Sequence, residues 1–245
     1  MNDPRSAERT FAFVDLAGFT ALTEAHGDAE ALAAVRAFRE RARACLESEA
    51  HLVKTIGDAL MLAFPDAETA VGALCRILEH ELSDPHHNLL PRAGAHHGTA
   101  IAEDGDFVGA AVNLASRVAG VARGGQIVAT TEVAVAARSE SRVVTYLGPT
   151  ALRNITGSVD LWEIQVLSTD LPPVFDPVCS MRVATEGPSV VHLSWDDKRA
   201  WFCGLACASR FAAAPHDFID RLRPGGEEVD ASARTACPPT SSRRC

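Results

Sequence analysis

The stretch FVDLAGFT, residues 13–20, takes the chain from an apolar segment to Asp15 and then to Gly18. The residues FAFV at 11–14 have the composition of a buried β-strand, and a run of good helix formers follows the glycine. This order predicts a strand, a tight loop and a helix, with a carboxylate where the strand ends. Aspartate is common at helix starts and in turns, so Asp15 alone is most simply a structural residue.

A second aspartate has a similar position in HLVKTIGDALMLAF, residues 51–64. This stretch predicts two strands around the turn Ile56-Gly57-Asp58. Two carboxylates that converge at neighbouring loop ends would form a hard-oxygen site suited to magnesium or manganese. Because glycine permits close approach to the backbone and a helix N-terminus offers free N–H groups, the loop after Asp15 would also suit a phosphate.

A third polar feature is the pair Asn113 and Arg117 in VNLASRV, four residues apart and therefore on one face of a predicted helix. Such a pair is usually the solvated face of an amphipathic helix. The neighbouring residues are small: Ala110, Ala111, Ala115 and Ser116. Small residues would let a ligand or a partner surface approach, and they serve simple helix packing equally well, so both interpretations stay open.

The order of the predicted elements divides the chain. Strands and helices alternate through residue 167, which favours an α/β or α+β sandwich with helices packed on a sheet. LSTDLPPVF contains a Pro-Pro pair and predicts a linker over residues 168–175. Cysteines, aromatic residues and short elements fill residues 176–222, and residues 223–245 read as a disordered tail.

The composition excludes several classes of protein. The chain has 245 residues, 47% hydrophobic and 22% charged, as is usual for a globular protein. A net charge of -9 without a clustered basic face argues against a nucleic acid partner. The N-terminus has no signal-peptide pattern, and no apolar run approaches the roughly 20 residues of a membrane span. We therefore expect a cytoplasmic protein with no membrane partner.

Three motifs, FVDLAGFT, KTIGDALMLAF and DFVGAAVNLASR, occur in an order and spacing that closely resemble the catalytic domain of the class III nucleotidyl cyclases. The resemblance covers about residues 9–166, within an expected domain at 9–167. It implies an α+β fold with a ferredoxin-like, palm-type sheet and helices packed on it. It also implies conversion of ATP to 3',5'-cyclic AMP and pyrophosphate by two-metal catalysis, at sites shared between the subunits of a homodimer.

The same resemblance gives roles to residues of this sequence. The two metal-binding aspartates of the family correspond to Asp15 and Asp58, with the Leu16 carbonyl as a further oxygen ligand. Two Mg²⁺ or Mn²⁺ ions per site are implied. Two metals held by paired carboxylates can stabilise the attacking and the leaving oxygen together.

Four further positions carry the residue types that the family uses. The pair that reads adenine corresponds to Lys54 and Asp106, the ribose-orienting asparagine to Asn113, and the arginine that stabilises the transition state to Arg117. Adenine offers an acceptor at N1 and a donor at N6, which an ammonium and a carboxylate complement. Guanine would leave these groups mispaired, at about 1 to 3 kcal/mol for each, so ATP is favoured over GTP.

Two alternatives and one gap accompany this interpretation. The chain could be a guanylyl cyclase, or a non-catalytic nucleotide-binding or scaffold protein whose output comes from its C-terminal part. The residue that holds the triphosphate is not assigned, and Arg153 is one candidate for it. Asn154 follows it where many relatives have a glycine, and asparagine tolerates the same left-handed backbone.

The C-terminal residues DPVCSMRV and WFCGLACASRFAAAPHDFI place Cys179, Cys203 and Cys207 in one small aromatic unit. It resembles the YHS domain and the related TRASH-type cysteine modules over about residues 175–222. The Tyr-His-Ser triplet itself is absent, and Ser180 stands where a glycine is common.

The resemblance implies a metal site, because thiolates favour soft or borderline ions such as Zn²⁺ or Cu⁺. A tetrahedral site needs a fourth ligand, for which Asp176, His192 and His216 are candidates. Three cysteines that are merely buried are an equal alternative. Regulation of the N-terminal domain by this module is a hypothesis from the layout of the chain alone.

Overall fold

The structure is a computed structural model that describes residues 5–46, 50–83, 89–140, 142–166, 174–187, 190–195 and 198–219. The expected tail at 223–245 lies outside these residues, as does most of the expected linker. None of the helices in these ranges is long and apolar enough to cross a membrane.

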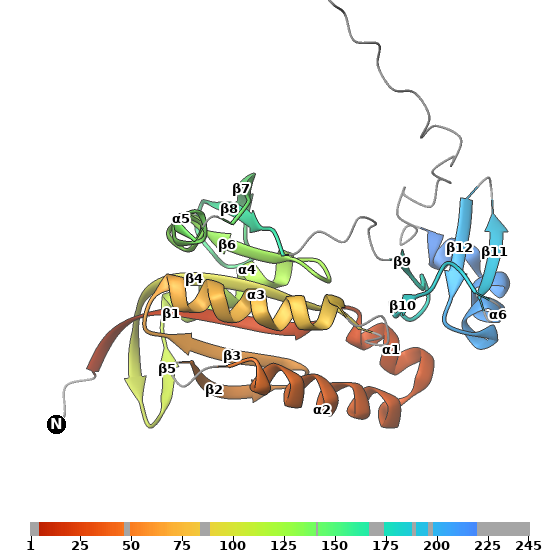
Figure 1. The fold of residues 1–245 in the computed structure, drawn as a ribbon, viewed down its shortest axis with the longest axis horizontal. Coiled ribbons are helices and arrows are strands. Elements are labelled where there is room, and N and C mark those ends of the chain that lie inside the picture. The colour runs from red at the N-terminus through yellow and green to blue at the C-terminus, as the bar shows by residue number, and fades with distance from the viewer. Residues whose placement is uncertain are drawn as a thin grey trace, which may run out of the picture.

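One eight-stranded sheet forms the centre of the N-terminal part (Figure 1). In spatial order its strands are β2 (His51–Ile56), β3 (Ala59–Phe64), β1 (Arg5–Leu16), β4 (Pro91–Glu103), β6 (Ile127–Thr130), β8 (Ser158–Ile164) and β7 (Val144–Ala151). The short strand β5 (Asp106–Val108) pairs with β4. All pairs are antiparallel except β4 with β6. The α+β class expected from the sequence is confirmed.

Helices cover both faces of this sheet. They are α1 (Phe19–His26), α2 (Asp28–Ala44), α3 (Ala67–Ser83), α4 (Ala110–Val121) and α5 (Thr131–Ser139). Alternate residues of a strand point to opposite faces. Ala12 and Val14 accordingly belong to the core formed with α2, α3 and α5, whereas Phe11 and Phe13 pack with α4. The α4 helix therefore lies alone on its face of the sheet among these five helices.

The close approach of α4 to β4 depends on Gly94. A Cβ atom at Gly94 would lie 1.9 Å from the backbone nitrogen of Ala119 in α4. The small residues Ala111 and Ala115 are likewise buried against the sheet. These alanines therefore serve packing, and Asn113 and Arg117 lie on the exposed side of the helix.

The C-terminal part is a separate small module beside α1 (Figure 1). It contains β9 (Val174–Phe175), β10 (Arg182–Val183), β11 (Val191–Trp195), β12 (Lys198–Phe202), α6 (Leu205–Ala213) and a short 3-10 helix (Pro215–Asp217). Strand β9 occupies the last two residues of the expected linker. The buried core of the module includes Phe202, Cys207 and Phe211.

We predict that Gly94→Ala destabilises the protein, because the added methyl group meets the α4 backbone and one of the two must shift. Overpacking a core of this kind costs about 3 kcal/mol at the upper end of the usual range. Urea unfolding followed by circular dichroism measures the loss. Gly120→Ala is the matched control, since a Cβ on this α4 glycine meets nothing within 4 Å; equal unfolding midpoints for the two variants would contradict the prediction.

Candidate active site

Asp15 lies at the end of β1, directly opposite Arg92 of β4. The two side chains form a bidentate ion pair, with Arg92 Nε 2.6 Å from Asp15 Oδ1 and Arg92 Nη2 3.2 Å from Oδ2. Arg92 Nη1 also donates to the carbonyl oxygens of Gly120 and Ala122, at 3.4 and 3.2 Å. These are free carbonyls at the C-terminal end of α4, where a cation is favourable. Arg92 thus ties the first carboxylate to the end of that helix.

Asp58 lies in the turn between β2 and β3, close to Asp15. Burial raises the pKa of Asp58, and the negative charge of Asp15 raises it further. Backbone N–H groups of Asp58 itself and of Leu16 act in the opposite direction. The structure therefore brings together Asp15, Leu16 and Asp58. Two carboxylates that repel each other fit a hard divalent cation such as Mg²⁺ or Mn²⁺, and the Leu16 carbonyl stays a predicted ligand.

Lys54 of β2 and Asp106 of β5 also come together. Lys54 Nζ donates to Asp106 Oδ2 at 2.5 Å, and the side chains are 41% and 40% exposed. The hydrogen bond from Lys54 lowers the pKa of Asp106, and the backbone N–H of Phe107, 2.8 Å from Oδ1, lowers it further. A donor and an acceptor thus stand side by side at an accessible position.

Asn113 and Arg117 share the exposed face of α4. Within the described residues neither side chain has a hydrogen-bond or ion-pair partner. The structure therefore joins the site residues in two groups, the carboxylate pair and the Lys54–Asp106 pair, and leaves the two α4 residues facing outward. Arg153 is also exposed, and Asn154 has a φ of 61°, the left-handed backbone expected of it.

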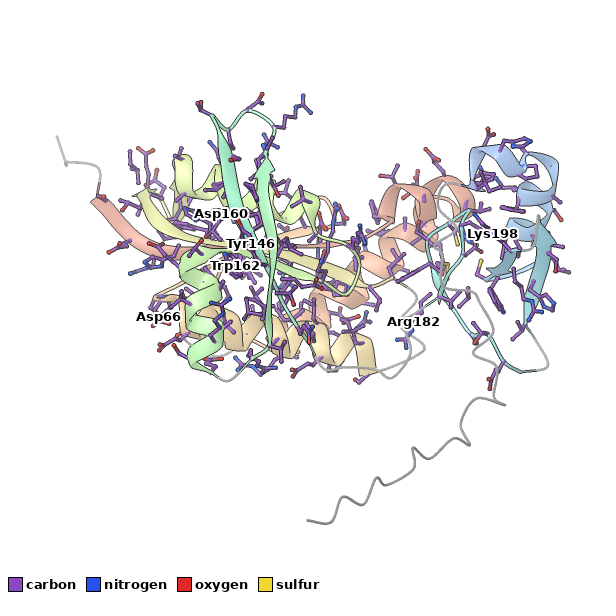
Figure 2. The ribbon with its side chains drawn as sticks, turned by 90° about the horizontal axis from the view of Figure 1, so that it is seen from above. Asp66, Tyr146, Asp160, Trp162, Arg182 and Lys198 are labelled. Carbon is purple, nitrogen blue, oxygen red and sulfur yellow. The ribbon has the colours of Figure 1, made fainter. Side chains whose placement is uncertain are left out.

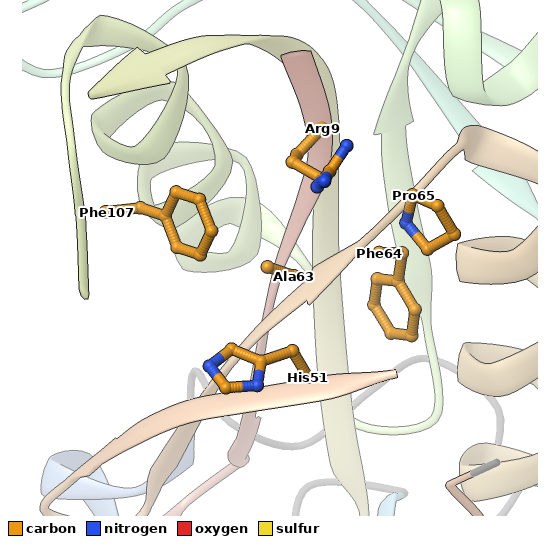
Figure 3. Close-up of a pocket in the computed structure, with 6 residues that line it drawn as sticks. All are labelled: Arg9, His51, Ala63, Phe64, Pro65 and Phe107. Carbon is orange, nitrogen blue, oxygen red and sulfur yellow. The ribbon is translucent and has the colours of Figure 1, made fainter. Parts of the chain in front are cut away.

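A pocket of about 450 Å³ lies where β3 ends, away from the turn that holds Asp58. Its lining residues are Arg9, His51, Ala63, Phe64, Pro65 and Phe107 (Figure 3). None of them is a site residue predicted from the sequence, but Phe107 directly follows Asp106. The pocket lining therefore includes neither the Lys54–Asp106 pair nor the two carboxylates.

The three cysteines of the C-terminal module form a cluster. Cys203 Sγ lies 3.6 Å from the sulfurs of both Cys179 and Cys207. A histidine from outside the module joins them: His26 Nε2, at the end of α1, is 3.5 Å from Cys203 Sγ and 3.7 Å from Cys207 Sγ. The four ligand atoms all lie within 4.8 Å of one another. His26 was not among the fourth ligands considered from the sequence.

The thiols in this cluster differ in acidity. The hydrogen bond with Cys179 lowers the pKa of Cys203 to about 7, and the same contact raises that of Cys179. Burial raises the pKa of Cys207 to about 12. The contact between Cys179 and Cys203 thus favours the thiolate at Cys203.

The sequence matches the family described as the adenylate and guanylate cyclase catalytic domain over residues 1–165. The match covers more than half of the chain, and the chain belongs to this family. The resemblance to the class III nucleotidyl cyclases is thereby confirmed. The match ends before the cysteine module.

Two curated relatives show the degree of similarity. A pH-sensitive adenylate cyclase of Mycobacterium tuberculosis is 34% identical over 166 residues, which are 66% of this chain and 42% of the relative. An adenylate cyclase of Streptomyces griseus is 38% identical over 111 residues, 45% of this chain and 28% of the relative. The matches thus span less than half the length of these relatives.

Solved structures agree on the fold. An adenylate/guanylate cyclase/hydrolase from Silicibacter pomeroyi is 26% identical with a TM-score of 0.58, over 67% of this chain and 99% of the other. The adenylyl cyclase CyaB from P. aeruginosa is 20% identical with a TM-score of 0.56, over 69% of this chain and 98% of the other. The second likeness concerns the fold alone.

We predict that Asp58→Asn raises the thermal stability of the metal-free protein at pH 7. A carboxyl whose pKa is raised on folding opposes folding once it is ionised. This effect is absent below the ordinary aspartate pKa of about 3.9 and grows as the pH rises through the raised value. The gain in melting temperature should therefore shrink from pH 7 toward pH 4.5 in buffers containing a chelator.

Asp66→Asn is the control with the opposite sign. Asp66 accepts a hydrogen bond from the backbone N–H of Thr69 at the start of α3, which lowers its pKa. Its removal should lower the melting temperature at pH 7. If Asp58→Asn also melted lower than the unaltered protein in chelator, Asp58 would not be under the repulsion described here.

Proposed function

We propose that the protein is an adenylyl cyclase that converts ATP to 3',5'-cyclic AMP and pyrophosphate. The observation that supports a preference for adenine over guanine is the Lys54–Asp106 pair. Its ammonium and carboxylate groups are 2.5 Å apart, and both are accessible. Exposed ion pairs contribute only about 0 to 1 kcal/mol, so a nucleobase can engage both groups at little cost. Lys54 then donates to adenine N1, and Asp106 accepts from the N6 amino group.

The metal, ribose and phosphoryl roles belong to the two carboxylates and to Asn113 and Arg117 of α4. Asp15 and Asp58, with the Leu16 carbonyl, would hold two Mg²⁺ or Mn²⁺ ions, and bound ions would supply Lewis-acid stabilisation to the attacking and leaving oxygens. Asn113 orients the ribose. Arg117 spreads its guanidinium over the charge that develops on the phosphoryl group, a task that suits its planar fork.

Active sites shared between two copies of the chain follow from the exposure of α4. Asn113 and Arg117 have no side-chain partner within the described residues and do not bond to Asp15 or Asp58. Exposed apolar side chains lie beside the site residues in the sequence: Ile56 is 50% exposed, Val108 59% and Val121 43%. Such side chains are typical of a surface that a second copy covers. A cytoplasmic location remains our prediction.

The direct test incubates the purified protein with ATP or GTP and Mn²⁺ and identifies the cyclic product by mass spectrometry. We expect cyclic AMP in clear excess over cyclic GMP, and Arg117→Ala should lose about two to three decades of kcat, as when one preorganised donor is removed. Arg123→Ala, an exposed arginine just beyond α4, is the control and should keep normal turnover. Cyclic GMP as the main product, or no cyclic product, would refute the proposal.

The shared site has a separate test. Asp58→Ala and Asn113→Ala chains should each be nearly inactive, because each lacks one half of every site. Mixing them should restore part of the activity, since a mixed dimer contains one site with neither change. Tagged chains purified in tandem verify that mixed dimers are present; no recovery in such dimers would mean that each chain builds its own site.

A further inference from the structure

We propose that His26 of α1 and the three cysteines Cys179, Cys203 and Cys207 form one zinc site that joins the C-terminal module to the catalytic domain. We further infer that zinc in this site stabilises the loop that carries Asp15. The first statement is independent of the proposed function. Its consequence for catalysis rests on that function.

Four of the six distances between the ligand atoms match a tetrahedral zinc site, and all six are within 4.8 Å. Zn–S bonds of about 2.3 Å and Zn–N bonds of about 2.0–2.1 Å place two sulfurs about 3.8 Å apart, and a sulfur and a nitrogen about 3.5 Å apart. The contacts in the cluster are 3.6 Å between sulfurs and 3.5 and 3.7 Å between sulfur and His26 Nε2. A disulfide would require about 2.05 Å. Three sulfurs and one nitrogen at these separations suit a borderline-soft ion such as Zn²⁺.

Asp176 holds the cysteine segments in place. Its Oδ1 accepts from the backbone N–H groups of Val178 and Cys179, at 2.8 and 3.3 Å, and its Oδ2 accepts from Cys203 N at 2.8 Å. The residue is only 1% exposed. Both oxygens are therefore engaged with the backbone, and Asp176 is a positioning residue whose place as fourth ligand His26 takes.

Contacts outside the cluster hold the module in the same position. Arg210 of α6 donates to the Glu24 carbonyl of α1 at 3.2 Å, and Arg182 of β10 donates to the Leu82 carbonyl of α3 at 3.0 Å. Figure 2 shows Arg182 at the junction of the two parts. Ala25 of α1 packs on the core of the module, and Met181 packs on the core of the catalytic domain. The approach of His26 to the sulfurs thus belongs to a wider interface.

The module touches both ends of α1. At the far end is His26, and at the near end a Cβ on Gly18 would lie 2.2 Å from Ser180 Cβ. Gly18 is the N-cap of α1 with a φ of 83° and follows Asp15 by three residues. A helix of eight residues is about 12 Å long. A metal bound by both Cys179 and His26 would therefore also hold Ser180, the residue after Cys179, against the loop that follows Asp15.

Zinc binding is tested on the full-length chain by competition with a chromogenic chelator and by Co²⁺ substitution. The unaltered protein should bind about one ion per chain and give the intense visible bands of a tetrahedral Co²⁺ thiolate site. His26→Ala should bind at least tenfold more weakly with shifted bands, and His26→Cys should recover tight binding. His192→Ala is the control, a module histidine outside the cluster. Unchanged affinity in His26→Ala, or no zinc in the unaltered protein, would overturn the proposal.

Coupling to the loop is measured by hydrogen exchange over residues 15–26 with and without Zn²⁺. Zinc should slow exchange at least severalfold in the unaltered chain and in His192→Ala, and should leave His26→Ala unchanged. Equal exchange with and without bound zinc would refute the coupling. Neither measurement depends on catalytic turnover. Zinc binding with a protected loop but no cyclic product would support this inference and refute the proposed function. A cyclic product without zinc binding would support the proposed function and refute this inference.

Discussion

Asp15 stands opposite Arg92 because β1 and β4 pair in one antiparallel register, from Arg5 against Ala102 to Leu16 against Pro91. Side chains alternate between the faces of a sheet, so a slip of one residue would reverse every one of them. Phe11 and Phe13 would then leave the α4 face, and the carboxylate at the end of the strand would turn away with them. The burial of two phenylalanines therefore specifies the direction in which Asp15 points. The ion pair with Arg92 fixes that direction at the open end of the strand.

The α4 residues of the candidate site, Asn113 and Arg117, owe their position to a residue without a side chain, Gly94 of β4. Gly94 lets the α4 backbone lie directly on β4, and the buried alanines of α4 continue this contact. A helix that rests on the sheet through one small-residue face must present its opposite face to solvent. That geometry directs Asn113 and Arg117 outward, where a second copy of the chain would use them in the proposed dimer. In the proposed dimer, tight packing within one subunit and a site completed by the other subunit are two results of the same arrangement.

Local signals in the sequence were enough for residues whose place depends on a strand end, a turn or a helix period. Asp15 and Asp58 follow from the first two, and the shared face of Asn113 and Arg117 on α4 follows from the third. The roles of Arg92 and His26 were not predicted from the sequence, because they depend on contacts between residues that are far apart in the chain. Arg92 is 77 residues from Asp15 and needs the strand register, and His26 is 177 residues from Cys203 and needs the docking of the module.

The two ends of α1 differ in the chemistry of the ions that they suit. Zinc binds a given site more tightly than manganese does, so affinity alone would let zinc displace manganese from the carboxylates. The ligand atoms of the two sites counteract this displacement. Asp15, Leu16 and Asp58 offer only oxygen, whereas the cluster at His26 offers sulfur and imidazole nitrogen. Under the two proposals, zinc at low concentration would fill the sulfur site first and leave the oxygen site to the abundant hard cations. Ser180 contacts Gly18 at one end of α1, and its neighbour Cys179 belongs to the cluster with His26 at the other end. Zinc in this cluster would therefore favour the geometry that the carboxylate site requires.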